Sequence, residues 1–301
     1  MKNKTFEDFE KEAQQYYQIL VNYKKAGQVF TDRNFHPALK IPEPSIDIYN
    51  PDYEWKRIDE YYQVPLFSPK HIHPDYVQQG SIGDCYFIAA LSRIAKQPDL
   101  VKSLFDTETS ARVFGEIPNS INLKCGAVVV KLHAFGREVP ILIDTQISFE
   151  KYKRNPRFVH PSDIQYSPWF CLVEKAFAKL QGSYSAIISG TLTFAIYSLF
   201  GYYQSQKTMK DLVTSQKMKP FEKLLDFQSK ACVIGASIHE DQLPTGLTEK
   251  DITEKGLCTT HIYVVTKVRA YKGMEFLCLR NPWGKHEWLG DYSDTSPLWT
   301  P

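Results

Sequence analysis

The sequence predicts an α+β protein with two lobes, a mainly helical first lobe and a second lobe of mostly antiparallel strands. Apolar residues recur at helical spacing directly after Cys85 and again over residues 169–180. The C-terminal third instead carries β-branched, alternating runs that are typical of strands, such as residues 261–268. A chain of 301 residues is long enough to form two globular units, each with its own core.

The remaining elements follow in chain order. Residues 5–25 are predicted to form an amphipathic helix that lies on the body of the protein or on a partner. Its apolar positions are spaced as on one helix face: Phe6, Phe9, Ala13, Tyr17 and Leu20. The segment after Gly27, up to Pro51, is expected to wrap the surface because its prolines prevent regular structure. Four further strands are predicted, at residues 127–132, 139–144, 231–237 and 276–279.

The composition argues against several classes of protein. The chain has 36 basic and 34 acidic residues, and a net charge of +2 is too balanced to suggest a nucleic-acid partner. The N-terminal residues are charged and polar, so no secretory signal is expected. Residues 186–200 are fairly apolar, but serine, threonine and glycine interrupt them. No transmembrane segment is therefore predicted.

Cys85 is the first candidate catalytic residue. It follows a turn at residues 79–84 that contains two glycines, and an apolar helical pattern begins directly after it. A helix N-terminus favours an anion, and such a site lowers a thiol pKa from about 8.5 to roughly 3.5–7.5. Gln79 can donate a side-chain amide to the same spot, as an oxyanion hole requires. The alternative is a buried cysteine on a core helix.

His261 and Asn281 offer the partners that a catalytic thiolate needs. His261 opens one predicted strand, and Asn281 closes the next at a Pro-Trp-Gly turn. Adjacent strands of a hairpin would set the imidazole beside the amide, whose oxygen can fix the tautomer of the ring. Alone, His261 is more typical of a satisfied strand histidine. The order Cys, His and then Asn-Pro-Trp-Gly is much more specific.

These residues lie in three blocks that resemble the calpain family of calcium-dependent cysteine proteases. The blocks are Gln-Gly-Ser-Ile-Gly-Asp-Cys-Tyr at residues 79–86, Thr-His-Ile-Tyr at 260–263 and Arg-Asn-Pro-Trp-Gly-Lys-His-Glu-Trp at 280–288. The resemblance covers roughly residues 27–296. The separation between the cysteine and the histidine also exceeds the papain-like spacing of about 130–150 residues.

The resemblance implies a papain-like core with two lobes and a cleft between them. The expected parts are an N-terminal helix and anchor segment at residues 1–40, a first catalytic lobe at 41–200 and a second at 201–301. The second lobe is expected to be incomplete at its C-terminal end. The expected partners are protein substrates and a regulatory domain or subunit beyond this chain. A cytoplasmic location is expected, because a nucleophilic thiol must stay reduced.

The same resemblance implies a role for each residue of the site. Cys85 would be the nucleophile, His261 the base and acid, and Asn281 the partner that orients the ring. Gln79 would hold the oxyanion together with the backbone N–H of Cys85. Trp283 would shield the histidine–asparagine bond from water, a role that its size suits. The reaction implied is hydrolysis of peptide bonds in proteins, by limited cuts through a thioester acyl-enzyme.

Calcium is the cofactor that the resemblance implies, with one ion in each lobe. In the first lobe Glu174 matches a ligand carboxylate, but Tyr76, beside Asp75, stands where a second acidic ligand is expected. In the second lobe Glu287 and Asp294 match two ligands. Calcium takes 6–8 oxygens, so two carboxylates alone make a weak site. An exposed pair of turn residues is the alternative for the second lobe.

Three departures from the family pattern leave other functions open. Tyr86 replaces a tryptophan, and Thr260 and Ile262 replace smaller residues on either side of His261. Bulk at these positions can narrow the cleft or tilt the ring, and a misplacement near 1 Å can cost on the order of 10²-fold in rate. A catalytically impaired homologue that acts as a protein-binding module is therefore an alternative. Acyl transfer to an amine by the same three residues is another.

Overall fold

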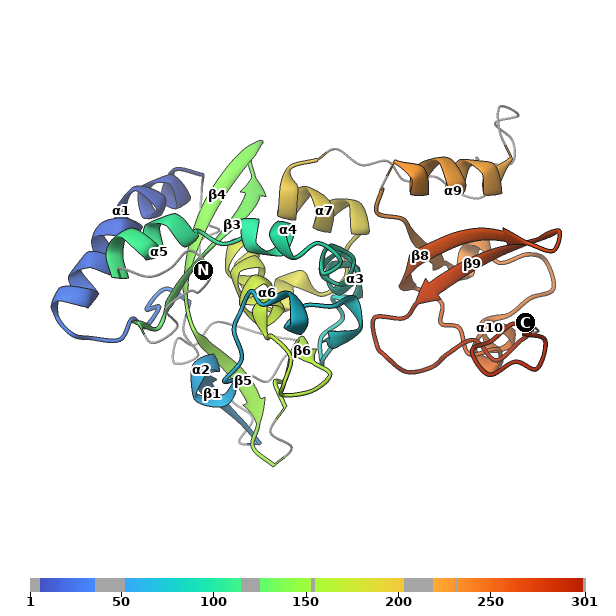
Figure 1. Ribbon diagram of the computed structural model, residues 1–301, viewed down its shortest axis with the longest axis horizontal. Coiled ribbons are helices and arrows are strands. Elements are labelled where there is room, and N and C mark those ends of the chain that lie inside the picture. The colour runs from blue at the N-terminus through green and yellow to red at the C-terminus, as the bar shows by residue number, and fades with distance from the viewer. Residues whose placement is uncertain are drawn as a thin grey trace. The chain divides into compact units, whose positions relative to one another are not determined.

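A computed structural model describes residues 6–35, 52–114, 125–152, 155–202, 219–230 and 232–299. The chain divides into two compact units, Met1–Gln204 (unit 1) and Ser205–Pro301 (unit 2), coloured blue to yellow and orange to red in Figure 1. Helices and small antiparallel sheets give the mixed α+β fold that the sequence predicts. Most of the predicted surface segment, residues 36–51, lies outside the described residues.

Unit 1 combines helices with small two-stranded sheets. Its helices are α1 (Phe6–Lys25), α2 (Ile58–Tyr61), α3 (Cys85–Ile94), α4 (Pro98–Ser103), α5 (Thr107–Phe114), α6 (Trp169–Gln181) and α7 (Leu192–Phe200). Short 3-10 helices are η1 (Pro69–His71), η2 (Pro74–Tyr76) and η4 (Ser185–Ile187). The antiparallel strand pairs are β1 (Tyr53–Arg57) with β5 (Gln146–Glu150), β2 (Val77–Gln78) with β6 (His160–Pro161), and β3 (Ala127–Ala134) with β4 (Arg137–Asp144).

Unit 2 is built on a three-stranded antiparallel sheet with the order β7-β8-β9. The strands are β7 (Gly235–Ile238), β8 (His261–Tyr271) and β9 (Met274–Arg280). Among the described residues of this unit, the helices α9 (Pro220–Ser229) and α10 (Glu249–Glu254) and the 3-10 helix η5 (Glu240–Gln242) accompany them. The strand predicted at residues 231–237 begins later than expected. Cys232 still bonds back to the α9 backbone, since its N–H donates to the Phe227 carbonyl at 3.0 Å.

The β3–β4 hairpin is the centre of unit 1. In Figure 1 it lies between α1 and α5 on one side and α6 and α7 on the other, and α1, α6 and α7 contact it directly. Residues 127–130 of β3 are all buried, so both faces of the strand are covered. This explains why the strand reads as a continuous apolar run rather than as an alternation. The predicted N-terminal helix therefore lies on the body of the protein, against β4 and α5.

Buried ion pairs fasten α1, α6 and β4 together. Lys179 of α6 lies 2.8 Å from Asp32 and 2.9 Å from Glu12 of α1. One turn earlier on the same helix, Lys175 pairs with Asp144, the last residue of β4, and both side chains are fully buried. Burial lowers the pKa of Lys175, while Asp144 acts in the opposite direction. Buried charges are tolerated when they are paired and hydrogen-bonded, as these are.

Replacing Lys179 by Met should destabilise unit 1 by about 3–5 kcal/mol, because Asp32 would stay buried without its cation. Urea unfolding followed by tryptophan fluorescence measures this loss. The control is Lys56→Met, which breaks a half-exposed pair with Glu54 (2.7 Å) in the same unit and should cost only about 0–1 kcal/mol. Equal losses in the two variants would contradict the importance of the buried pair.

Candidate active site

Cys85 is the first residue of α3, as the sequence predicts, and its side chain is half-buried. The helix begins there because the chain leaves the glycine turn and enters a run of mostly buried residues that continues to Ile94. The N–H groups of Phe87 and Ile88 donate to the Asp84 carbonyl at 2.8 and 3.1 Å, which closes the first turn. The thiol therefore stands at the end of a helix where backbone N–H groups accumulate.

Tyr86 is accommodated inside unit 1. Its hydroxyl donates to the backbone carbonyl of Ile187 at 3.1 Å, and its ring packs against Gly190. A Cβ atom at Gly190 would lie only 2.5 Å from that ring, so glycine makes the space that the ring occupies. Burial raises the pKa of Tyr86 well above its ordinary value. The tyrosine thus anchors the start of α3 instead of disturbing it.

The turn before Cys85 contacts residues 157–158, which are far away in the sequence. Ser81 donates its N–H to the Arg157 carbonyl at 2.9 Å. Gly80 lies so close to Phe158 that a Cβ there would come within 1.9 Å of the Phe158 carbonyl oxygen, which only glycine allows. Gln79 donates from Nε2 to the Ile82 carbonyl at 2.7 Å. Because an amide nitrogen carries two hydrogens, Gln79 retains a second donor for an oxyanion.

Two buried carboxyl groups lie beneath this turn. Asp84 is fully buried, and Glu174 of α6 is 2% exposed. Burial raises the pKa of both groups, and the nearby Asp84 raises that of Glu174 further. The Val159 N–H donates to Oε1 of Glu174 at 3.0 Å. Sequence reasoning did not single out Asp84, although an acidic residue directly before an apolar helix is a usable signal.

The carboxyl pair belongs to the contact between α3 and α6. Three residues further along each helix, Phe87 and Phe177 stack with ring centroids 4.1 Å apart and planes 7° apart. The Glu174 carboxylate already accepts the Val159 N–H and is buried inside this contact. The environment of Glu174 therefore favours a structural role, and its role as a calcium ligand stays a prediction without geometric support.

In unit 2, His261 and Asn281 form a buried hydrogen bond. His261 is 3% exposed, and its Nε2 lies 2.8 Å from Oδ1 of Asn281. The Asn281 amide nitrogen donates to the carbonyls of Lys285 and His286 at 2.7 and 3.1 Å, and its Oδ1 accepts from the Trp283 N–H at 3.1 Å. Oδ1 is therefore the acceptor for the ring. Nε2 carries the hydrogen, which leaves Nδ1 as the basic nitrogen.

Aromatic rings enclose the imidazole. The Trp283 ring centroid lies 4.1 Å from that of His261, with planes tilted by 34°, and Tyr263 approaches at 5.0 Å with its edge. Burial lowers the pKa of His261, an effect that the hydrogen bond to Asn281 partly opposes. The ring is accordingly held in its neutral form and shielded from water.

The bulk beside His261 does not break this arrangement. Thr260 adopts φ +53°, in the left-handed region, and its N–H donates to the Ile238 carbonyl at 2.7 Å. Ile262 is half-buried and pairs with Ser237 of β7. With these neighbours the imidazole keeps its hydrogen bond to Asn281, so the expected tilt of the ring does not separate the pair.

The predicted residues divide between the two units. Cys85, Gln79 and Glu174 belong to unit 1, whereas the histidine, Asn281 and Trp283 belong to unit 2. Within unit 2 the structure brings the last three into direct contact.

The expected calcium ligands of unit 2 are exposed. Glu287 and Asp294 both lie in the segment after β9, and neither is buried. Among the residues that the structure describes, no group of three or more His, Cys, Asp and Glu side chains could hold a metal ion. Two carboxylates fall well short of the 6–8 oxygens that calcium takes. The side chains present thus do not form a complete calcium site, and the chemistry below uses no ion.

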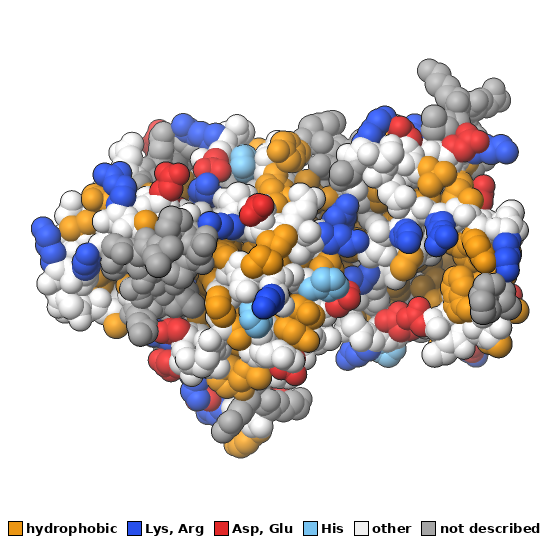
Figure 2. All heavy atoms as spheres, in the orientation of Figure 1, with side chains coloured by type: hydrophobic (Ala, Val, Ile, Leu, Met, Phe, Trp, Pro, Cys, Tyr) orange, Lys and Arg blue, Asp and Glu red, His pale blue; other side chains and the backbone are white. Residues whose placement is uncertain are grey.

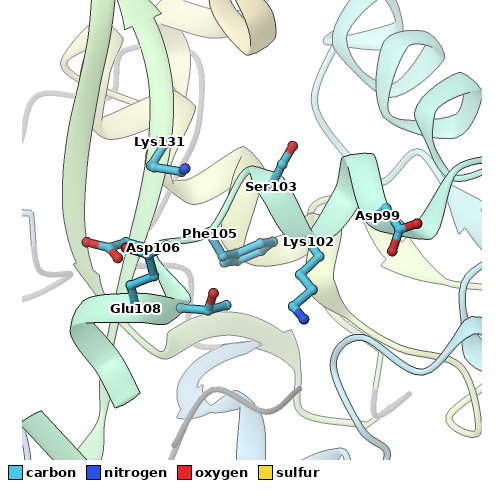
Figure 3. Close-up of a pocket in the computed structure, with 8 residues that line it drawn as sticks. Asp99, Lys102, Ser103, Phe105, Asp106, Glu108 and Lys131 are labelled. Carbon is cyan, nitrogen blue, oxygen red and sulfur yellow. The ribbon is translucent and has the colours of Figure 1, made fainter. Parts of the chain in front are cut away.

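A polar depression elsewhere in unit 1 carries charges of both signs. Figure 3 shows Lys102 and Lys131 together with Asp99, Asp106 and Glu108 around Phe105. It contains none of the candidate catalytic residues. Basic and acidic side chains are likewise interspersed on the face of the protein in Figure 2.

Comparison with known proteins identifies the family of the chain. The model described as "Calpain family cysteine protease" matches residues 30–301. A calpain of Schistosoma mansoni is 27% identical over 299 residues, which cover 95% of this chain and 36% of that protein. Calpain-13 of Rattus norvegicus is 31% identical over 255 residues, 83% of this chain and 35% of that protein. For the calpain-1 catalytic subunit of Homo sapiens the identity is 27% over 300 residues, 95% of this chain and 38% of that protein.

These matches place the chain in the class of cysteine peptidases, enzymes that hydrolyse peptide bonds. Within that class, the chain belongs to the calpain family of cysteine proteases, which are commonly calcium-dependent. It spans 35–38% of the length of the three relatives compared. No helix among the described residues combines the length and apolar character that crossing a membrane requires.

Because His261 is buried, the free energy of unfolding should decrease as the pH is lowered. Because the folded pKa of His261 is lower than its unfolded value of about 6.5, the unfolded chain binds the proton more readily. Its contribution to the free energy of unfolding is therefore full above pH of about 6.5 and is lost as the pH falls toward the folded pKa. Urea unfolding at pH 7.5 and 5.5 should show a larger drop for the unsubstituted chain than for His261→Gln. His286→Gln, at an exposed position, should keep the drop, and equal drops in all three would contradict this interpretation.

Proposed function

We propose that the chain is a cysteine endopeptidase that makes limited cuts in protein substrates. Cys85 is the nucleophile, His261 the general base and acid, and Asn281 the residue that orients the ring. The observation that carries the proposal is the buried hydrogen bond of 2.8 Å between His261 and Asn281, which leaves Nδ1 of the ring as a base. The cysteine at the start of α3 supplies the complementary group. Membership in the calpain family supports the same reaction.

In the proposed reaction, Nδ1 of His261 takes the thiol proton of Cys85. The N-terminus of α3 stabilises the resulting thiolate. The thiolate attacks the peptide carbonyl carbon, and the oxygen becomes an anion that accepts hydrogen bonds from the second amide hydrogen of Gln79 and the Cys85 backbone N–H. The imidazolium then gives its proton to the amide nitrogen, the C–N bond breaks and the amine leaves.

Deacylation reverses the roles. Nδ1 of His261 takes a proton from water, the hydroxide attacks the thioester carbon, and the C–S bond breaks as the proton returns to sulfur. Throughout both halves Asn281 keeps accepting the Nε2 hydrogen, and Trp283 excludes water from that bond. The reaction thus needs Cys85 and His261 to act on the same peptide bond, one from each unit.

Calcium dependence is a second part of the proposal. Support comes from the family, in which calcium dependence is common, and from the exposed carboxylates of Glu287 and Asp294. In this chain the two side chains would hold the ion together with backbone or water oxygens. A cytoplasmic location and a regulatory domain or subunit outside this chain complete the proposal.

A catalytically impaired homologue that binds proteins is the second candidate. The observation that favours it is the bulk of Thr260 and Ile262 beside His261, at positions where the family has smaller residues. Thr260 also adopts φ +53°, a conformation that is unfavourable for a β-branched residue. Such a protein would retain the fold and bind substrate-like segments without cleaving them.

Covalent labelling of Cys85 tests the enzyme. A peptidyl vinyl sulfone should label the chain, and Cys85→Ala should lose both the label and the cleavage of casein. Cys278→Ala, which removes an exposed thiol of unit 2, is the matched control and should keep both. Asn281→Ala should lower the turnover rate on the order of 10²-fold or more, because the ring loses its orientation. A folded chain with no labelling of Cys85 at any calcium concentration would favour the binding module, and added amine appearing in the product would favour acyl transfer.

Chelation of calcium tests the second part. Casein cleavage should fall to background in excess EGTA and return when calcium is added. The double variant Glu287→Gln with Asp294→Asn should need at least about tenfold more calcium for half-maximal activity, since it removes two anionic ligands. Asp291→Asn, an exposed change in the same loop, is the control and should respond as the unsubstituted chain does. Cleavage that is indifferent to EGTA would remove calcium from the proposal without affecting the roles of Cys85 and His261.

A further inference from the structure

Tyr76 and Tyr166 form a face-to-face stack in unit 1. Their ring centroids lie 3.4 Å apart and their planes differ by 4°. Tyr76 is the last residue of η2, and Tyr166 lies in the turn before α6, so the stack joins parts of the chain that are remote in sequence. Both side chains are half-buried. Each ring covers a face of the other, and the removal of this apolar area from water favours the contact.

Hydrogen bonds join the same two segments on both sides of the stack. Ser162 donates its N–H to the Tyr76 carbonyl at 2.9 Å, and the adjacent strands β2 and β6 pair there. On the other side, the Ser167 N–H donates to the His71 carbonyl at 3.1 Å. The His71 ring also bonds the Gln165 carbonyl at 2.8 Å. Residues 71–78 are therefore held against residues 160–167 along their length.

This contact leads directly to the Gln79 turn. Gln79 follows β2 without a spacer, and Gly80 and Ser81 continue the same association by packing on Phe158 and bonding Arg157. The position of the Gln79 amide thus depends on how firmly the preceding segment is held.

The acidic groups expected to bind an ion in unit 1 are not placed to do so. Tyr76 occupies one expected ligand position, and its ring is used in the stack. The neighbouring Asp75 is exposed and lies 3.4 Å from His73. Glu174 is buried and accepts the Val159 N–H, and the described residues contain no group of three or more His, Cys, Asp and Glu side chains that could hold a metal ion. The donor set of unit 1 therefore does not fit calcium, which needs several ionised or carbonyl oxygens that converge.

We propose that the Tyr76–Tyr166 stack, rather than a bound ion, holds the Gln79 turn in place, so that unit 1 keeps its part of the site without calcium. Tyr76 and Tyr166 are then positioning residues for Gln79. The inference rests on the proposed function for the role of Gln79, and it confines any calcium requirement to unit 2.

Hydrogen exchange with mass spectrometry tests the stack in the full chain carrying Cys85→Ala, which prevents self-cleavage. Peptides covering residues 76–83 and 157–167 should show the same protection in EGTA and in millimolar calcium. Tyr76→Ala should speed exchange in both peptides by about tenfold or more, because it opens the contact between the segments. Tyr76→Phe keeps the stacked ring and should restore protection, and Tyr152→Ala, which changes a tyrosine that is 86% exposed, should have no effect. Protection that rises with calcium, or that Tyr76→Ala leaves unchanged, would overturn the proposal.

Kinetics separate positioning of Gln79 from general loss of structure. With Cys85 present, Tyr76→Ala should lower kcat by about tenfold and leave KM nearly unchanged, because the oxyanion forms only during reaction. Tyr76→Phe should restore kcat. A fall in kcat that Tyr76→Phe does not rescue would contradict the role of the ring. If Cys85 is not labelled, the proposed peptidase activity is contradicted, but the hydrogen-exchange result still stands. If exchange depends on calcium, only the proposed role of the Tyr76–Tyr166 stack is contradicted.

Discussion

The proposed chemistry depends on the hydrogen bond between His261 and Asn281. A buried histidine is ordinarily a neutral core residue, and nothing in its burial alone makes it a base. The orientation of the Asn281 side chain makes the difference. Its amide nitrogen donates to two backbone carbonyls of the following loop, and these hydrogen bonds fix which way the amide faces. The oxygen must therefore face the ring, and the ring must present Nδ1. The Pro-Trp-Gly turn thus defines the tautomer as well as the position of the base.

Helix α6 plays the corresponding part in unit 1. It is buried for most of its length, yet it carries Glu174, Lys175 and Lys179, which are costly to bury. Each of these groups has a partner in another part of unit 1, so the helix connects α1, β4 and the segment that contains Val159. The Phe87–Phe177 stack then fixes α3 against α6. The position of Cys85 consequently follows from a polar network as well as from apolar packing.

The sequence predicts those helices, strands and turns whose residue pattern is local, because hydrophobic spacing and turn residues act over short stretches of chain. Three of these patterns lie within about a dozen residues each, so they can be recognised in the sequence. They are the alternation of apolar residues in β8, the Pro-Trp-Gly turn after β9 and the helical spacing of apolar residues after Cys85. The partners of Lys179 and the stack of Tyr76 on Tyr166 involve segments far apart in the chain. No local pattern encodes such contacts. The start of β7 was missed for a different reason, because apolar residues 232–234 match a strand but follow directly on the last turn of α9.

The residues around each departure from the family pattern accommodate it, which bears on whether the chain is an enzyme. Tyr86 fits because position 190 is glycine, and the ring of Tyr76 is covered by Tyr166. Thr260 keeps a backbone hydrogen bond to Ile238 despite its left-handed conformation. These contacts leave Gln79, Cys85 and the histidine–asparagine pair in local environments that suit the proposed peptide hydrolysis, which favours the proposed enzyme over the binding module.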